Sequence, residues 1–426
     1  MHEIIHGTAV ALSVKLVAAI VGLIFHVMIA RMLGANGAGQ FILALTCVTL
    51  ATVFARAGLD NVLVRLISTN SHVGNWHSVS TIWRNSLKIS VPASFLSAIL
   101  LFFASDFLAT ELFGDQTLGT NIAIMALSVP FLALALLHAE MLRGLKHIAA
   151  YHALQGVTVP TITIAGLFVL APYWGVTGAA TGYIIATVAT MAYAVILWRK
   201  ALPNVMVGGD DVTCKTLFHS SMPLLWAASM FFINGWIAII VLGIYSTPTD
   251  VAYFNAATKL AWLTSFVLIA VNSISASKFA TIYKTGTMLE MERTAIKTTR
   301  LMVIVATPVI LTCMLIPDFL LELFGEGFGF AAPVLQILIV GQTVNVLTGS
   351  IGQILMMTGH ETDLRNVITS SALLNTLLAI WLAQHYGLIG IAWSVTITTI
   401  YTSIAASILV RRRLGVSVHA FSKLKK

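Results

Sequence analysis

The sequence predicts an all-α polytopic membrane protein with about 12 transmembrane helices in two six-helix lobes. Of its 426 residues, 58% are hydrophobic and only 9% are charged. Apolar runs of about 20 or more residues, the length that crosses a bilayer, are separated by short polar breaks. The basic residues gather in alternate breaks, as in a chain that crosses the membrane repeatedly. No soluble domain is expected.

Each apolar run is interpreted as one helix. The first, at 8–30, is too long for a signal-peptide core and lacks a small-residue cleavage site, so we expect it to remain as a transmembrane helix. Two runs, at 40–68 and 252–280, exceed a bilayer crossing and imply tilt or projection past the membrane. The other predicted helices lie at 83–104, 119–142, 148–170, 176–198, 217–243, 300–321, 331–357, 366–384 and 388–410.

The distribution of basic residues predicts the orientation. If both termini are cytoplasmic, 20 of the 24 Lys and Arg residues fall at cytoplasmic ends and loops, and the outer loops hold only Arg31. The expected location is therefore the bacterial cytoplasmic (inner) membrane, with a multi-pass chain and both termini inside. The net charge of +8 is spread over many short loops and a tail, so nucleic acid is not an expected partner.

The chain repeats itself at a spacing of about 210 residues. Six crossings per repeat is an even number, so the lobes should point the same way, related by a pseudo-two-fold axis along the membrane normal. The predicted domains are an N-terminal lobe at 1–205, a C-terminal lobe at 206–413 and a basic cytoplasmic tail at 414–426. The matched segments are 112–115 with 323–326, 175–178 with 387–390, 199–200 with 411–413, and 33–41 with 242–254, the last with a longer turn.

Three basic side chains, Lys15, Arg56 and Lys259, lie inside apolar runs. A cation at mid-bilayer costs roughly 2.5 to 3.5 kcal/mol on insertion scales, so each needs a reason. One interpretation is a polar cavity that receives an anionic headgroup. The alternative is that Arg56 and Asp60, four residues apart, neutralise one another while the two lysines extend to the membrane surfaces.

The helical neighbours of these cations are smaller or more polar than a lipid-facing stripe would be. They make Asp60, His26 and Asn255 candidate supporting residues, together with Arg31 beyond the end of the first run. The neighbours are Ala11, Ala18, Ala19, Gly22 and His26 for Lys15; Thr49, Thr52 and Asp60 for Arg56; and Asn255, Trp262 and Phe266 for Lys259.

Two stretches carry a family resemblance. The segment 30–41, with Ala57-Gly58-Leu59-Asp60 and Val64-Arg65, resembles the first two helices of polysaccharide-biosynthesis flippases of the multidrug/oligosaccharidyl-lipid/polysaccharide exporter superfamily. The segment 234–259 resembles their seventh and eighth helices. The resemblance implies a two-lobed transporter of twelve or fourteen helices that moves lipid-linked sugars to the outer leaflet.

The resemblance also implies roles for the three cations. Relatives that flip lipid diphosphates carry cations on helices 1, 2 and 8 facing the central cavity, and Lys15, Arg56 and Lys259 occupy those helices here. Relatives often have an acidic residue just before the Leu-Gly that ends helix 7. The segment 236–241 contains none, so ion coupling at that position has no support.

The leading hypothesis is a flippase for a polyprenyl-diphosphate oligosaccharide, working by alternating access in envelope or extracellular polysaccharide synthesis, and not an enzyme. Expected partners are the lipid-linked sugar, membrane lipids and other polysaccharide-assembly proteins. One alternative is a cation-coupled multidrug exporter, which should show carboxylates in its lobes, whereas Asp60 is the only deep acid expected here. Another is a membrane glycan polymerase or ligase, which should display a large outer loop.

Other motifs are weaker. The segment 2–6 has the spacing of a zinc metalloprotease helix but starts where a helix frays. A third ligand would have to be His26 or the distant Asp60, so no metal is expected. No cofactor is expected either, because the Gly-rich segment 34–39 follows a helix and is interpreted as a turn. His138 and Glu140 near a cytoplasmic helix end are interpreted either as part of a proton path or simply as solvated residues.

Overall fold

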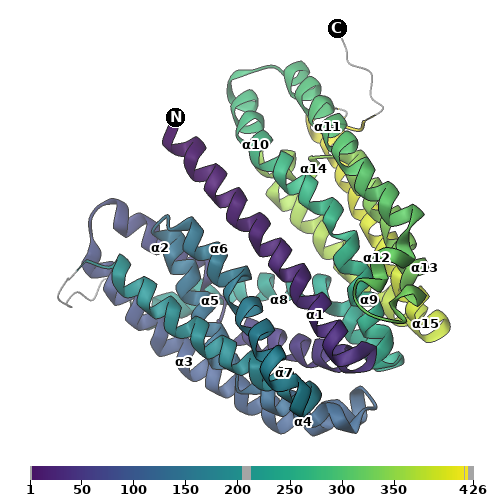
Figure 1. The fold of residues 1–426 in the computed structure, drawn as a ribbon. Coiled ribbons are helices and arrows are strands. Elements are labelled where there is room, and N and C mark those ends of the chain that lie inside the picture. Colours follow the sequence, from purple (N-terminus) through teal and green to yellow (C-terminus); the bar gives the residue numbers. More distant parts are fainter. Residues whose placement is uncertain (1, 204–212, 417, 421–426) are drawn as a thin grey trace. The chain divides into compact units, whose positions relative to one another are not determined.

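The structure, a computed structural model, describes residues 2–203, 213–416 and 418–420, and these contain helices and no strand (Figure 1). Contacts divide the chain into two compact units, Met1–Ile233 and Asn234–Lys426. The predicted lobe boundary at residues 205 and 206 stays a prediction. Part of the predicted tail at 414–426 lies outside the described residues.

In the first unit, α1 packs against α3, α5, α6 and α7. Leu63, Leu142 and Trp198 come from three different helices and share one apolar core, in which each is at most 1% exposed. The elements are α1 (His2–Ala55), α2 (Leu59–His72), α3 (Trp76–Phe107), a π-helical turn η1 (Leu108–Leu112), α4 (Gln116–Ala126), α5 (Val129–Gly144), α6 (Ile148–Gly156), α7 (Thr158–Ala201) and the first part of α8 (Cys214–Tyr245).

In the second unit, α13 packs against α15, and α11 packs against α10 and α13. Phe279, Ile354 and Val410 are fully buried in one core that joins three helices. The elements are the rest of α8, α9 (Pro248–Ala261), α10 (Leu263–Thr285), α11 (Met288–Leu315), α12 (Pro317–Glu322), a 3-10 turn η2 (Phe328–Ala331), α13 (Ala332–Thr348), α14 (Ile351–Met357) and α15 (Glu361–Leu414).

Three helices are too long for one crossing. At about 1.5 Å per residue, the 54 residues of α1 or α15 would extend far beyond a hydrocarbon layer of about 30 Å. Each long helix contains one glycine with non-helical torsion angles: Gly34 in α1 (φ 69°), Gly175 in α7 (φ 55°) and Gly387 in α15 (φ 53°). Each is therefore two helices that meet at a glycine turn.

Length and composition confirm a polytopic all-α membrane protein. Six helical stretches of the described chain are long and apolar enough to cross a membrane, or eight if each of two bent pairs forms one span. The prediction of twelve crossings and the axis relating the two lobes stay predictions.

The repeat at 175–178 and 387–390 has the same local backbone in both units. Gly175 and Gly387 have nearly identical torsion angles, with φ 55° and ψ −130° against φ 53° and ψ −131°. Three residues later, a Cβ on Gly178 would overlap the carbonyl oxygen of Leu170, and one on Gly390 would overlap that of Leu382. Each glycine pair thus provides a tight turn and then a close helix contact.

The predicted single helix at 40–68 is broken in the structure. Helix α1 ends at Ala55, Ala57 and Gly58 adopt positive φ angles of 49° and 70°, and α2 starts at Leu59. A Cβ on Gly58 would overlap the backbone of Ser221 and Leu225 in the first part of α8, so glycine is needed for space as well as conformation. This break places Arg56 between two helices.

Candidate functional site

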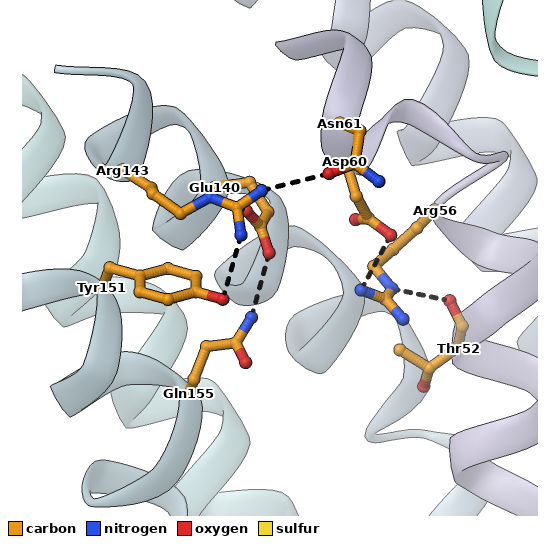
Figure 2. Close-up of polar contacts among 8 residues, drawn as sticks. All are labelled: Thr52, Arg56, Asp60, Asn61, Glu140, Arg143, Tyr151 and Gln155. Atoms are coloured by element: carbon orange, nitrogen blue, oxygen red, sulfur yellow. Dashed lines mark hydrogen bonds and ion pairs between the residues drawn. The ribbon is translucent and has the colours of Figure 1, made fainter. Parts of the chain in front are cut away.

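Arg56 lies at the break between α1 and α2 and forms an ion pair with Asp60 (Figure 2). Its Nη1 is 3.0 Å from Asp60 Oδ2, its Nε donates to the Thr52 carbonyl at 3.4 Å, and the two charged side chains are 17% and 19% exposed. Arg56 follows the C-terminus of α1 and Asp60 lies in the first turn of α2, where each helix dipole favours the charge beside it. The ion pair between Arg56 and Asp60, which their spacing of four residues suggested, is therefore present.

A second ion pair lies on α5, and its two members form hydrogen bonds with α2 and α6. The Glu140 Oε2 to Arg143 Nε distance is 3.0 Å, although its angle is not that of a hydrogen bond. Arg143 also donates to the Tyr151 hydroxyl at 3.3 Å and to Asn61 Oδ1 at 3.2 Å, and Gln155 donates to Glu140 Oε1 at 3.1 Å (Figure 2). Glu140 is only 4% exposed, so its interpretation as a solvated helix-end residue is wrong.

His138 is a packing residue in this structure. It is 1% exposed, and its ring meets those of Trp83 and Trp198 edge to face. Trp83 Nε1 donates to His138 Nε2 at 3.2 Å, and His138 Nδ1 lies 2.7 Å from the Leu134 carbonyl. An Nε2 that accepts and an Nδ1 that donates assign the neutral tautomer. Both ring nitrogens are thus occupied, which argues against a proton path through this side chain.

Lys15 is half-buried on α1, close enough to His152 on α6 for a Coulombic interaction. The small-residue face of α1 is partly a close helix contact, because a Cβ on Gly156 of α6 would lie 2.9 Å from the Ala18 Cβ. One turn further along α1, nothing lies within 4 Å of a Cβ built on Gly22. The Lys15 face therefore combines a packed part with an open part.

The remaining predicted supporting residues are placed as follows. His26 lies on α1 with its Nδ1 2.7 Å from the Gly22 carbonyl, and Arg31 is exposed on the same helix. Asn255 is 3% exposed on α9. Asp60, also a predicted supporting residue, is paired directly with the predicted cation Arg56.

Lys259 belongs to the second unit. Its Nζ lies 5.4 Å from the centre of the Trp262 ring, a cation–π contact. Unlike Arg56, neither Lys15 nor Lys259 forms an ion pair within the part of the chain that the structure describes. Because Lys15 and Arg56 lie in the first unit and Lys259 in the second, a single cavity faced by all three stays a prediction.

A cavity of about 320 Å³ opens beside Lys259 within the second unit. Thr258 of α9 and Trp262, between α9 and α10, form part of its wall. None of its lining residues carries a charge. The sequence did not single it out, because its polar groups are amides and hydroxyls dispersed over four helices. Those groups belong to Asn234, Gln342, Asn345, Asn375, Ser371 and Thr402, among others.

Residues 4–277, more than half of the chain, match the family model described as polysaccharide biosynthesis protein. The chain belongs to this family. The resemblance found in the sequence is thereby confirmed.

Two curated relatives are similar in sequence. The putative O-antigen transporter of Shigella flexneri is 23% identical over 389 residues, which cover 87% of this chain and 89% of that protein. Stage V sporulation protein B of Bacillus subtilis (strain 168) is 27% identical over 187 residues, 43% of this chain and 36% of that protein. The chain thus matches about a third of the length of the second relative.

Two solved structures share the fold. The lipid II flippase MurJ in an inward closed conformation matches with a TM-score of 0.77 and 16% identity, covering 93% of this chain and 86% of that one. An inward-facing multidrug resistance transporter of the MATE family, from the MOP superfamily, matches with a TM-score of 0.77 and 15% identity, covering 96% and 98%. At these identities the likeness concerns the fold.

Proposed function

We propose that this protein is a flippase that moves a polyprenyl-diphosphate-linked oligosaccharide from the inner to the outer leaflet by alternating access. The family membership, the O-antigen transporter relative and the fold shared with a lipid II flippase support the proposal. The observation that carries it is the pair of lysines, Lys15 and Lys259, inside apolar helices without a carboxylate partner in the described structure.

A diphosphate headgroup suits these lysines chemically. An ammonium in an apolar helix is costly unless an anion accepts its hydrogen bonds, and phosphate oxygens are strong acceptors. Arg56 uses only part of its five-donor guanidinium on Asp60 and Thr52, which leaves donors for a phosphate. The hydrocarbon tail stays in the lipid, and no bond is made or broken, so the proposal assigns no enzymatic activity.

The multidrug exporter is the second candidate, since the MATE transporter shares the fold. A cationic drug would require carboxylates that are free to pair with it. Asp60 is paired with Arg56, and the buried Glu140 is paired with Arg143. These two carboxylates are therefore already neutralised, which favours an anionic substrate.

The proposed setting is the bacterial cytoplasmic membrane with both termini on the cytoplasmic side. The proposed partners are the lipid-linked sugar, surrounding lipids and other proteins of polysaccharide assembly. Outward movement of an anion is favoured by about 2.3 kcal/mol per charge per 100 mV, so the membrane potential could assist the proposed transport.

Charge substitutions test the proposal. Lys15→Gln and Lys259→Gln should reach the membrane normally, whereas Arg56→Gln should reach it at a lower level because Asp60 is left unpaired. Per molecule of protein in the membrane, each variant should lower glycan export at least about ten-fold, because a charge-assisted hydrogen bond to phosphate is lost. Lys15→Arg and Lys259→Arg should retain much of the export, whereas Arg56→Lys should fare worse, since an ammonium does not reproduce a bidentate grip.

Lys88 offers a matched control, because it is an exposed lysine on α3. Lys88→Gln should export like the unaltered protein. Normal export by well-expressed Gln variants at all three predicted positions would contradict the proposed phosphate site.

A further inference from the structure

The cavity in the second unit has the composition of a site for a neutral, hydroxyl-rich ligand. Its volume of about 320 Å³ lies in the range of small-molecule sites. Four helices, α8, α9, α13 and α15, supply amide and hydroxyl side chains to its wall, with no Asp, Glu, Lys or Arg among the lining residues.

Several of these polar groups have hydrogen-bonding capacity that the protein itself does not use. Asn375 is 4% exposed and its Oδ1 accepts from Ser394 at 2.8 Å, but its amide nitrogen has no partner among the described residues. Thr258 Oγ1 is buried without a partner. The half-buried Asn234 side chain also lines the cavity and forms no hydrogen bond within the described chain. Buried polar groups are normally satisfied, so the unpartnered Thr258 hydroxyl, beside the unused amide groups of Asn375 and Asn234 in the same cavity wall, points to a ligand.

An aromatic side chain completes the wall. Trp262 is 52% exposed and lines the cavity, while the Lys259 ammonium lies over its ring. The apolar face of a sugar ring packs on an aromatic ring, and its hydroxyls both donate and accept hydrogen bonds as amides do. A metal cation fits less well, because no carboxylate lines the cavity and the Lys259 ammonium would repel it.

We propose that this cavity binds an uncharged sugar residue of the lipid-linked oligosaccharide, next to the phosphate that Lys259 contacts. The inference rests on the proposed function, from which it takes the lipid-linked class of substrate. It adds that two separate parts of the protein recognise the substrate. The lysine recognises the phosphate that all such lipids share, and the neutral cavity recognises the sugar.

Thr258→Val and Asn234→Leu are suitable test variants. Each removes polar atoms that have no partner inside the protein, so neither should weaken the fold. Thr376→Val is the matched control. Its hydroxyl donates to the Ala372 carbonyl on α15, beside Asn375 in sequence, and Thr376 does not line the cavity.

The experiment measures binding of two lipids to purified protein in nanodiscs: a polyprenyl diphosphate without sugar, and the same lipid carrying one neutral hexose. Thr258→Val and Asn234→Leu should each weaken binding of the glycosylated lipid about five- to ten-fold and leave the sugar-free lipid unchanged. Lys259→Gln should weaken binding of both lipids, and Thr376→Val of neither.

The two possible failures are distinguishable. Cavity variants that change binding of both lipids equally, or of neither, would overturn the sugar site. Binding of the glycosylated lipid would also be compared in sodium and in choline buffer. Weaker binding in choline, with no such difference in the cavity variants, would overturn the sugar site in favour of a cation site. Lys259→Gln with unchanged binding of both lipids would instead contradict the proposed phosphate contact.

Discussion

At the residue scale, two ion pairs between an arginine and a carboxylate in the first unit involve residues of α2 or residues that contact it. Arg56 with Asp60 and Arg143 with Glu140 each place an arginine 3.0 Å from a carboxylate. In a poorly hydrated environment, removing one member costs more than removing both, because it leaves an uncompensated charge. The two members of each pair are therefore expected to depend on one another energetically.

A double-mutant cycle tests the first pair. Arg56→Ala should destabilise the protein more than the double variant Arg56→Ala/Asp60→Asn, with a coupling energy of roughly 1 to 3 kcal/mol in thermal unfolding. The exposed pair Arg413 and Asp363, with side chains 54% and 21% exposed, is the comparison and should couple by under about 1 kcal/mol. Strict additivity at Arg56 and Asp60 would show that they do not interact.

Sequence reasoning found the Arg56 and Asp60 pair because the two residues are four apart. It did not find the network around Glu140, because Arg143 bonds Asn61 across 82 residues of sequence and Gln155 lies on another helix. The i, i+3 spacing of Glu140 and Arg143 was the one available signal. The sequence did not reveal the cavity beside Lys259, because single uncharged Asn, Ser and Thr residues do not stand out in an apolar run as a charged residue does.

At the element scale, single glycines determine where helices turn. Polar breaks near 30–40, 170–176 and 384–388 correctly predicted that the chain turns there, and the structure narrows each turn to Gly34, Gly175 or Gly387. The break at residues 56–58 was not predicted, because Ala57 and Gly58 lie within a continuous apolar run. A left-handed backbone conformation has no hydropathy signature.

Alanine substitutions test the repeated turns. Gly178→Ala and Gly390→Ala should each destabilise the protein by about 1 to 3 kcal/mol or more, because the new Cβ would overlap a carbonyl oxygen in the same unit. Gly22→Ala on α1 is the control and should be tolerated, since nothing lies within 4 Å of its Cβ. Thermal unfolding of the purified variants measures both effects. Equal tolerance of all three would contradict the shared geometry of the turns.

At the scale of the whole molecule, the sequence predicted an all-helical membrane protein of two lobes, and each compact unit is helical. Composition and run length carry this information because the bilayer restricts the chain to helices. The number of crossings was harder to predict, since broken and bent helices divide the apolar runs unevenly. The orientation rests on the positive-inside asymmetry alone.

Cysteine labelling tests that orientation. After replacement of the free cysteines Cys47, Cys214 and Cys313, single cysteines would be placed at Thr110 and Lys200, both exposed. In intact cells an impermeant reagent should label position 110, and position 200 only after permeabilisation, because the basic loops remain inside. Labelling in the reverse pattern would contradict both the orientation and the proposed direction of transport.

The most direct test of the proposed function is flipping by the purified protein in vesicles. A fluorescent, short-chain polyprenyl-diphosphate sugar and a phosphate-free glycolipid with the same tail would be followed by quenching from outside. The protein should move the diphosphate lipid, Lys15→Gln and Lys259→Gln should slow it at least about ten-fold, and the phosphate-free lipid should move as in empty vesicles. Equal rates for the two lipids, or unchanged rates in both lysine variants, would contradict a flippase that recognises its substrate by phosphate.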